Sequence, residues 1–267
     1  MAFKDARRER GLYRAEVLRT ERVTPHMMRV TVAGDDLTRL PHHGYDQWFR
    51  LFLPRSSGDT DFSAVPEQFG VASYVKFLLN SPAATRPVVR SYTVRAFRPD
   101  AGEVDIDFVT HGDLGEAGPW ATRAQPGERV MLLDQGRGFD PLPSAGAYLF
   151  AGDESALPAI LGILRDLPRD ARGVAVLEVI DADDAQPHEA PDGVAVRWIA
   201  RDDGARPGSA ALAALQGVPI DDPGTLVAYL AGEQALPAEG RRHLVSAGVP
   251  KNRIVFTGYW RLGKAAL

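Results

Sequence analysis

Short runs in which hydrophobic and polar residues alternate fill the first half of the chain. Turn residues separate these runs, which lie at residues 29–32, 47–53, 91–95, 103–109 and 129–133. Alternation with a period of two is typical of β-strands that have one buried face. A small closed barrel accounts for several such antiparallel strands better than an open sheet, because a barrel has no exposed edges. By contrast, the polar stretch 54–71 predicts a surface loop.

The pattern changes after the Pro-Leu-Pro sequence at residues 141–143. Apolar runs then predict strands at 147–151, 173–180, 194–200, 225–230 and 253–257, and amphipathic stretches predict helices at 156–167, 209–215 and 237–247. Strands that alternate with helices indicate a parallel sheet that is covered on both faces and binds ligands at the carboxyl ends of its strands. We therefore expect two domains, a six-stranded antiparallel barrel over residues 1–143 and a doubly wound parallel-sheet domain over residues 144–267.

Composition narrows the chemistry that the chain can perform. Cysteine is absent from the 267 residues, which excludes disulfides, cysteine nucleophiles and cysteine-ligated metal centres. Any redox reaction would therefore need a bound organic cofactor. Lys and Arg total 31 against 35 Asp and Glu, and this net charge of −4 does not favour nucleic-acid binding. No apolar run is long enough to span a bilayer. We expect a soluble, cytoplasmic monomer without membrane insertion.

Residues 90–93, Arg-Ser-Tyr-Thr, combine a cation, a flat aromatic ring and two hydroxyl groups on one predicted strand. Alternation places Arg90 and Tyr92 on one face of that strand and Ser91 and Thr93 on the other. An aromatic ring can fix the plane of a bound ring system, and an arginine matches phosphate with paired donors. The alternative interpretation is an ordinary barrel strand with a half-buried tyrosine and a solvated arginine.

An Arg-x-Tyr-Thr motif in a barrel that precedes an α/β domain resembles the flavin motif of ferredoxin-reductase-like flavoproteins. Four further segments follow in order along both domains: DFVTHG at 107–112, GEAGPWA at 115–121, GDESALPA at 152–159 and GYWRLGKA at 258–265. Together they resemble the siderophore-interacting protein family, whose members are NAD(P)H-dependent ferric-siderophore reductases that bind FAD. The resemblance extends from about residue 15 to the end of the chain.

The resemblance implies an FAD site on the barrel. Tyr92 would lie against the isoalloxazine ring, Thr93 would hydrogen-bond near its reactive nitrogen, and Arg90 would neutralise phosphate, so Tyr92 and Thr93 are the expected catalytic residues. A short helix that opens at Pro119 would hold the pyrophosphate at its start, although a capped turn is the alternative. The expected FAD-binding residues are Arg90, Ser91, Tyr92, Thr93, Asp107, Phe108, Val109, His111, Gly115, Ala117, Gly118 and Trp120. No metal site is expected.

Nicotinamide binding is expected at the carboxyl ends of the strands in the second domain. The turn 152–155 lacks the glycine-rich dinucleotide fingerprint, and its two carboxylates would repel a pyrophosphate placed against them. The dinucleotide should therefore lie across this turn. Arg201 could clamp a 2′-phosphate, whereas the acidic residues 202 and 203 favour an unphosphorylated ribose, so NADPH and NADH both stay open. The residues expected to bind it are Gly152, Asp153, Glu154, Ser155, Arg201, Gly232 and Glu233.

The resemblance also suggests how an anionic iron chelate would bind. Arg50 stands where many relatives have a lysine, and Arg261 and Lys264 follow the last predicted strand. With Trp260 they are the expected substrate-binding residues, and each alone could equally be a solvated surface residue. The expected function is ferric-siderophore reduction with electrons from NADPH or NADH through FAD. The alternatives are a general NAD(P)H:flavin or ferredoxin-type reductase and a non-catalytic flavin- or siderophore-binding protein.

Overall fold

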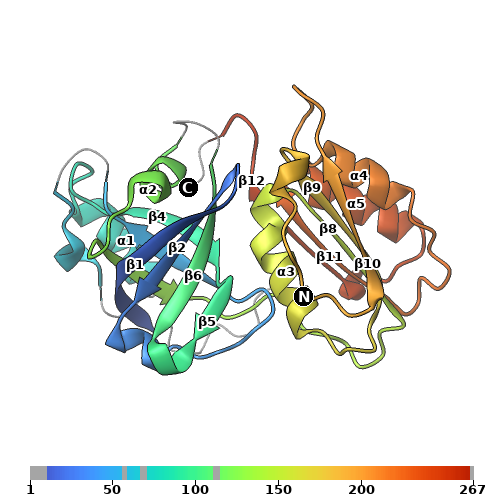
Figure 1. Ribbon diagram of the computed structural model, residues 1–267, viewed down its shortest axis with the longest axis horizontal. Coiled ribbons are helices and arrows are strands. Elements are labelled where there is room, and N and C mark those ends of the chain that lie inside the picture. Colours follow the sequence, from blue (N-terminus) through green and yellow to red (C-terminus); the bar gives the residue numbers. More distant parts are fainter. Residues whose placement is uncertain (1–10, 56–58, 67–70, 111–114, 265–267) are drawn as a thin grey trace.

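The computed structural model describes residues 11–55, 59–66, 71–110 and 115–264. The first half of the chain forms an antiparallel sheet and the second half a parallel sheet, and the two lie side by side (Figure 1). This arrangement confirms the expected fold class. Within the described ranges, none of the helices has both the length and the apolar character needed to cross a membrane.

The antiparallel sheet has the strand order β4-β3-β7-β1-β2-β6-β5. Val30, Leu51, Ile106 and Leu132, from four of these strands, are completely buried in one core, as the alternating pattern predicts. The strands are β1 (Leu12–Thr24), β2 (Met27–Ala33), β3 (Trp48–Leu53), β4 (Val88–Thr93), β5 (Ala96–Arg98), β6 (Glu103–Val109) and β7 (Arg129–Asp134).

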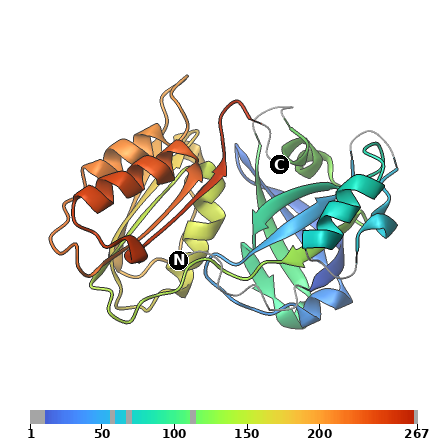
Figure 2. The ribbon, with the colours of Figure 1, turned by 180° about the vertical axis from the view of Figure 1, so that it is seen from behind.

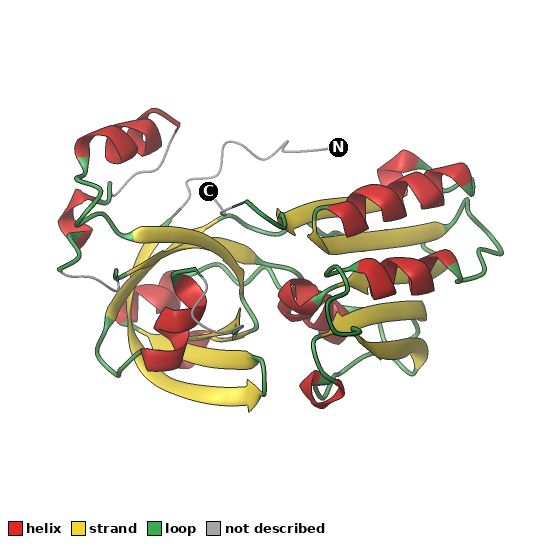
Figure 3. Cartoon of the chain, turned by 90° about the horizontal axis from the view of Figure 1, so that it is seen from above, coloured by secondary structure: helices red, strands yellow, loops and turns green. Residues whose placement is uncertain are grey.

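The two end strands of this sheet, β4 and β5, belong to one chain segment that changes neighbours. β4 pairs with β3 and β5 pairs with β6. Between them, the Val94 amide donates to the Gln47 carbonyl at 2.8 Å, and the Arg95 amide donates to the Asp105 carbonyl at 2.9 Å. The sheet therefore has seven strands where six were expected, because the segment 88–98 contributes one short strand to each side of it. Figure 3 shows the curved strands from above.

Helix α1 (Val71–Asn80) is absent from the elements that the sequence predicts. It follows the polar stretch expected to be a loop, which contains the short 3-10 helix η2 (Phe62–Ala64). Phe77 of α1 covers the outer face of β3, where its ring centroid lies 6.0 Å from that of Phe52. The sequence pattern hides this helix because only part of its surface packs against the sheet: Leu79 is 78% exposed.

The parallel sheet has the strand order β10-β9-β8-β11-β12. Helices α4 and α5 cover its outer face, and α3 lies between the sheet and the barrel (Figures 1 and 2). The strands are β8 (Ala147–Gly152), β9 (Arg172–Val179), β10 (Gly193–Ala200), β11 (Leu226–Glu233) and β12 (Ile254–Trp260). The helices are α3 (Leu157–Asp166), α4 (Ser209–Gln216) and α5 (Ala235–Ser246). The remaining short 3-10 helices are η1 (Asp35–Arg39), η3 (Pro99–Ala101), η4 (Glu154–Ala156), η5 (Ala182–Asp184) and η6 (Lys251–Arg253).

Specific contacts join the two halves. Met27 of the barrel packs in the same hydrophobic cluster as α3. The buried carboxylate of Asp184, in η5, accepts hydrogen bonds from the Thr24 hydroxyl at 2.7 Å and from the His26 amide at 2.9 Å, and its other oxygen lies 2.7 Å from His26 Nδ1. The turn between β1 and β2 is therefore anchored to the α/β half, and this fixes how the two sheets face each other.

Candidate functional site

The register of β3 and β4 sets the orientation of the Arg-Ser-Tyr-Thr strand. Phe49 lies opposite Tyr92 and Arg50 lies opposite Ser91. Directly paired residues share a face of an antiparallel sheet. Tyr92 therefore shares a face with the core residue Phe49, and Arg50 shares the other face with Ser91 and Thr93. This is the separation that alternation predicts.

Tyr92 rests on a row of aromatic side chains. Its ring centroid lies 4.3 Å from that of Phe108, which lies 5.5 Å from that of Trp120. Phe108 and Trp120 are at most 1% exposed, whereas Tyr92 is only partly buried. Burial raises the pKa of the Tyr92 hydroxyl, although the Arg90 charge acts in the opposite direction. Phe108 and Trp120 thus support Tyr92 from behind, and their side chains do not offer a binding surface.

Asp107, also expected to bind the cofactor, lies in a buried ion pair. Its carboxylate accepts from Arg29 Nε at 2.7 Å and from Arg29 Nη2 at 2.9 Å, and Arg95 Nε lies 3.6 Å away. The Asp107 side chain is 1% exposed. It therefore holds β6 against β2 and against the segment that bridges the barrel.

Helix α2 begins two residues earlier than the sequence suggests. It spans Ala117–Arg123, so Pro119 lies inside its first turn and Gly118 is already helical. Gly115 precedes the helix with a φ of 79°, a conformation that favours glycine. Val109 ends β6 and is half-buried. His111 lies outside the described residues.

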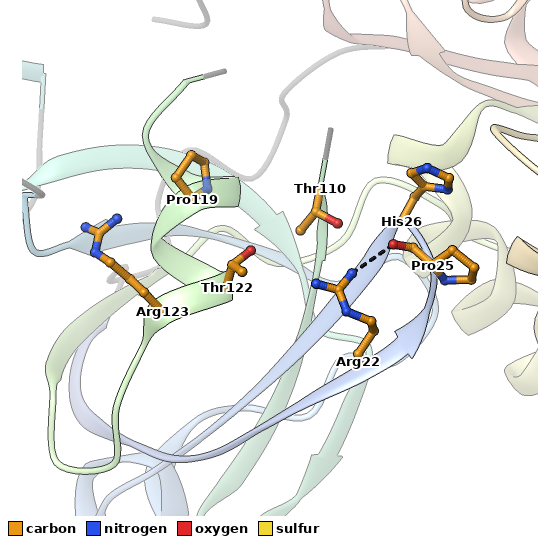
Figure 4. A pocket seen from close by; sticks show the side chains of 7 residues that line it. All are labelled: Arg22, Pro25, His26, Thr110, Pro119, Thr122 and Arg123. Carbon is orange, nitrogen blue, oxygen red and sulfur yellow. Dashed lines mark hydrogen bonds between the residues drawn. The ribbon is translucent and has the colours of Figure 1, made fainter. Parts of the chain in front are cut away.

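A cavity of about 500 Å³ separates α2 from the turn between β1 and β2 (Figure 4). Three basic residues and two threonines contribute to its polar lining. Arg22 Nη1 donates to the Pro25 carbonyl at 2.8 Å, which holds its guanidinium at the rim. The lining residues are Arg22, Pro25, His26, Thr110, Pro119, Thr122 and Arg123.

The two glycine-containing turns of the parallel sheet meet at one buried carboxylate. Asp153 accepts from the Ser155 amide at 3.0 Å, from the Glu233 amide at 2.5 Å and from Trp260 Nε1 at 3.2 Å. Gly232 has a φ of 130°, and a Cβ there would lie 2.6 Å from the Asp153 carboxyl carbon. Burial and the neighbouring charge of Glu154 raise the pKa of Asp153 to about 6. The structure thus brings residues 152–155, 232–233 and 260 together at the carboxyl edge of the sheet.

Arg201 also lies at this edge, but two carboxylates hold its guanidinium. Nη1 donates to Glu154 and to Glu178, each at 2.9 Å. The side chain of Glu178 is completely buried and also accepts from the amides of Gly208, Ala210 and Ala211 at 2.7–3.0 Å. A 2′-phosphate would therefore compete with both carboxylates for Arg201.

Two tyrosines that sequence reasoning missed pair across neighbouring strands of the parallel sheet. The Tyr229 hydroxyl of β11 lies 2.8 Å from the Tyr259 hydroxyl of β12. Burial is the main cause that raises the pKa of both hydroxyls. Tyr259 of β12 thus contacts β11, whereas Trp260, one of the expected substrate-binding residues, donates to Asp153. The only feature of the sequence that could have drawn attention to Tyr259 is its place in the run GYW at 258–260.

The expected substrate-binding cations come from two elements. Arg261 and Lys264 are exposed and face each other across a turn, in which the Lys264 amide donates to the Arg261 carbonyl at 3.0 Å. The chain after β12 arches towards the barrel (Figure 2). Arg50 lies on β3, on the face that also carries Thr93. The arrangement brings Arg261 and Lys264 together and places Arg50 on a separate strand.

Family models match both halves of the chain. A siderophore-interacting FAD-binding domain matches residues 16–138, and a siderophore-interacting protein domain matches residues 145–263. Ferric vibriobactin reductase ViuB of Vibrio cholerae is 31% identical over 93% of this chain and 89% of its own length. An NADPH-dependent ferric-chelate reductase of Escherichia coli is 29% identical over 91% of each chain. The crystal structure of a siderophore utilization protein from T. fusca is 31% identical, superposes with a TM-score of 0.79 and covers 97% of both chains. With both domain models matched in order along nearly its whole length, the chain belongs to the siderophore-interacting protein family.

Proposed function

We propose that this protein is an FAD-dependent ferric-siderophore reductase that takes electrons from NADPH or NADH and passes them to chelated Fe(III). One observation carries the proposal: β6, whose Phe108 backs Tyr92, ends at Val109, which packs against the hydrophobic cluster that includes Ala156 at the carboxyl edge of the parallel sheet. A cofactor on the barrel and a dinucleotide on the sheet would be adjacent there. The two reductases similar to this chain support the same assignment.

The residues at the barrel fit FAD by the chemistry of their donors. The partly exposed Tyr92 ring, backed by Phe108, offers a flat surface to a ring system. The guanidinium of Arg90 suits a phosphate, and the basic lining of the cavity beside α2 suits a pyrophosphate. Thr93 offers a buried hydroxyl. When bound, FAD would accept two electrons from a nicotinamide and deliver them singly to iron, and the protein's task is to orient both reactants.

The donor nucleotide would lie across residues 152–155 and 232–233. Asp153 and Glu233 are fully buried and bonded to backbone amides, so they shape this surface without presenting free charge to a pyrophosphate. Since such nucleotides are cytoplasmic metabolites, we also propose that the protein works in the cytoplasm. An anaerobic titration tests the function. NADPH or NADH should bleach the flavin absorbance, and a ferric siderophore should restore it; a protein that stays oxidised would be a binding protein.

Arg90 and Tyr92 are expected to control FAD affinity. Arg90→Ala removes charge-assisted hydrogen bonds worth about 1.5–3 kcal/mol, so the Kd for FAD should rise about ten- to a hundredfold. Tyr92→Ala should also raise it, because it deletes the stacking surface. Fluorescence titration of the apoprotein with FAD gives both constants.

Arg197→Ala is the matched control, because Arg197 is exposed on the distant edge strand β10. Its FAD affinity should equal that of the parent. If Arg90→Ala and Tyr92→Ala proteins both retain the parent Kd and flavin spectrum, the cofactor does not lie on β4.

Arg261 and Lys264 are expected to steer an anionic iron chelate towards the site. The protein is net negative, so such a substrate needs a local positive region to approach. Arg261→Glu or Lys264→Glu should lower the apparent affinity for the ferric chelate severalfold and flatten its dependence on salt near 0.1 M, where the Debye length is about 10 Å. Steady-state chelate reduction at several ionic strengths measures both effects.

Lys251→Glu makes the same charge change on η6 of the same domain and should leave the salt dependence as in the parent. Stopped-flow reduction of the flavin by the nicotinamide distinguishes the two sides of the site. Slower flavin reduction in the Lys264 variant, with chelate affinity intact, would assign this turn to the nicotinamide instead.

A further inference from the structure

Two arginines pair with three of the four buried carboxylates at the carboxyl edge of the parallel sheet. Each of these contacts is 2.9 Å long, and the pairs are Glu154 and Glu178 with Arg201, and Glu233 with Arg206. Asp153 is completely buried and has no ion pair in the part of the chain that the structure describes. Without a counter-charge, it is the carboxylate of the four that takes up a proton most readily.

Asp153 accepts four hydrogen bonds from three chain segments. Its Oδ1 accepts from the Ser155 amide at 3.0 Å and from the Ser155 hydroxyl at 2.5 Å. Its Oδ2 accepts from the Glu233 amide at 2.5 Å and from Trp260 Nε1 at 3.2 Å. Gly232 approaches so closely that a Cβ there would lie 2.6 Å from the Asp153 carboxyl carbon. The carboxyl group therefore has no room to swing away from these donors.

Only one of the four donors can also accept a hydrogen bond. The three N–H groups are donors alone, whereas the Ser155 hydroxyl is both donor and acceptor. A proton added at Asp153 Oδ1 therefore finds its acceptor at Ser155 Oγ, and Oδ2 keeps both of its donors. Protonation thus reverses one hydrogen bond and leaves the links between the strands in place. The hydrogen of the Ser155 hydroxyl, which the ionised carboxylate holds, becomes free for another acceptor.

A dinucleotide lying across residues 152–155 would favour the protonated form. Its pyrophosphate is an anion, and a buried carboxylate close to it repels it, because the protein interior screens charge poorly. Protonation of Asp153 removes that charge. The freed hydroxyl of Ser155, which is half-buried in this turn, can then donate to a phosphate oxygen. Both effects act in the same direction.

The other groups around Asp153 that can carry charge are held by partners of their own. The glutamates are paired with arginines, the two tyrosine hydroxyls bond each other at 2.8 Å, and the aspartate of β6 is paired with Arg29. These groups are Asp107, Glu154, Glu178, Arg201, Arg206, Tyr229, Glu233 and Tyr259. Burial, and next the charge of Glu154, raise the pKa of Asp153 to about 6. Proton uptake at this edge is therefore assigned to Asp153.

We propose that Asp153 is a positioning residue that couples binding of the donor nucleotide to uptake of one proton: the proton enters at Asp153 Oδ1, and the Ser155 hydroxyl turns from Asp153 to the pyrophosphate. The inference rests on the proposed function, in which NADPH or NADH lies across this turn. The proton comes from solvent and returns to it when the nucleotide leaves, so no further reactant is needed. Affinity for the nucleotide then falls as the pH rises.

Binding of ADP-ribose to the FAD-loaded protein tests this coupling without electron transfer. This probe carries the pyrophosphate, which does not titrate near neutral pH, and lacks the nicotinamide ring. We expect its Kd to rise about tenfold from pH 6 to pH 8, because the bound anion raises the pKa of Asp153 above its value in the free protein. Calorimetry at pH 7 in two buffers of different ionisation enthalpy should show uptake of roughly half a proton per bound nucleotide.

Asp153→Asn imitates the protonated form. Its amide keeps a carbonyl oxygen for the donors from β11 and β12 and offers an N–H group to Ser155 Oγ. At pH 8 it should bind ADP-ribose about tenfold more tightly than the parent, with no dependence on pH and no proton uptake. Asp222→Asn is the matched control. Asp222 also accepts from a hydroxyl, that of Thr225 at 2.7 Å, but it is exposed at the opposite edge of the sheet, so the parent pH dependence should persist.

A Kd that is equal at pH 6 and pH 8, or that falls as the pH rises, would overturn the proposal. A pH dependence that survives in Asp153→Asn, or a parent that binds no ADP-ribose, would overturn it too. If Asp153→Asn does not fold, Ser155→Ala replaces it. That variant should weaken binding severalfold at pH 6 and less at pH 8, since the hydroxyl is free to donate only when Asp153 is protonated, and equal losses would contradict the coupling.

Failure of the proposed function gives a different result. In that case, NADPH and NADH would leave the flavin of the parent protein oxidised in the anaerobic titration. Failure of the coupling alone would leave the bleaching of the flavin intact and would alter only the pH dependence of ADP-ribose binding.

Discussion

Replacing Asp107 with alanine is expected to lower the free energy of unfolding by about 3–5 kcal/mol. The carboxylate forms a two-pronged hydrogen-bonded pair with Arg29, and Arg95 Nε, which is buried without a hydrogen-bond partner of its own, lies 3.6 Å away. Alanine would leave both guanidinium groups without this charge in the barrel wall. Burial already lowers the pKa of Arg95, and the Asp107 charge opposes that shift.

Urea unfolding followed by tryptophan fluorescence measures the loss. Asp100→Ala is the control, because Asp100 is an exposed aspartate of η3 in the same domain, and its change should stay within about 0.5 kcal/mol. A loss below about 1 kcal/mol for Asp107→Ala would mean that water replaces the carboxylate and that the ion pair does not hold the barrel wall together.

A comparable loss, also about 3–5 kcal/mol, is expected from Glu178→Ala in the parallel-sheet domain. The Glu178 carboxylate joins three backbone amides at the start of α4 to Arg201. Its removal leaves Arg201 with Glu154 alone and leaves buried N–H groups without acceptors, each of which costs free energy.

Hydrogen exchange localises this effect. The amides of Gly208, Ala210 and Ala211 should lose protection in Glu178→Ala before those of the barrel strands do. Glu189→Ala, at an exposed glutamate of the same domain, should leave them protected. Unchanged protection of the three amides in Glu178→Ala would contradict the role assigned to this carboxylate.

Sequence pattern predicts most of the fold because most strands have one buried face or are buried on both. The strand at Leu226–Glu233 is buried throughout, and its apolar run is plain in the sequence. The ends of helices are harder to predict where a residue that is typical of a helix start lies inside the first turn. Pro119 marks a helix start in the sequence, but the helix begins at Ala117, since proline is tolerated throughout a first turn, where amides lack partners.

The residues of the candidate site differ in the same way in how far the sequence predicts them. The Arg-Ser-Tyr-Thr strand is local in sequence, so its residues could be named and their faces assigned. Tyr229 and Tyr259 are 30 residues apart in the chain, and only the pairing of β11 with β12 brings their hydroxyls together. Arg201 is a different case: an arginine at a sheet edge suggests an anion site, and the sequence does not reveal that Glu154 and Glu178, both buried, accept hydrogen bonds from it.

The position of β7 has a consequence for how the protein is made. This strand comes last in the barrel sequence, yet it lies between β1 and β3 in the sheet. During synthesis, the edges of β1 and β3 stay unpaired until residues 129–134 leave the ribosome, about 6–24 s after β1 at ordinary elongation rates. Two hydrophobic strand edges are thus open to wrong partners for that time. Faster emergence of the β7 segment, or a chaperone that shields both edges, would therefore raise the yield of folded chains.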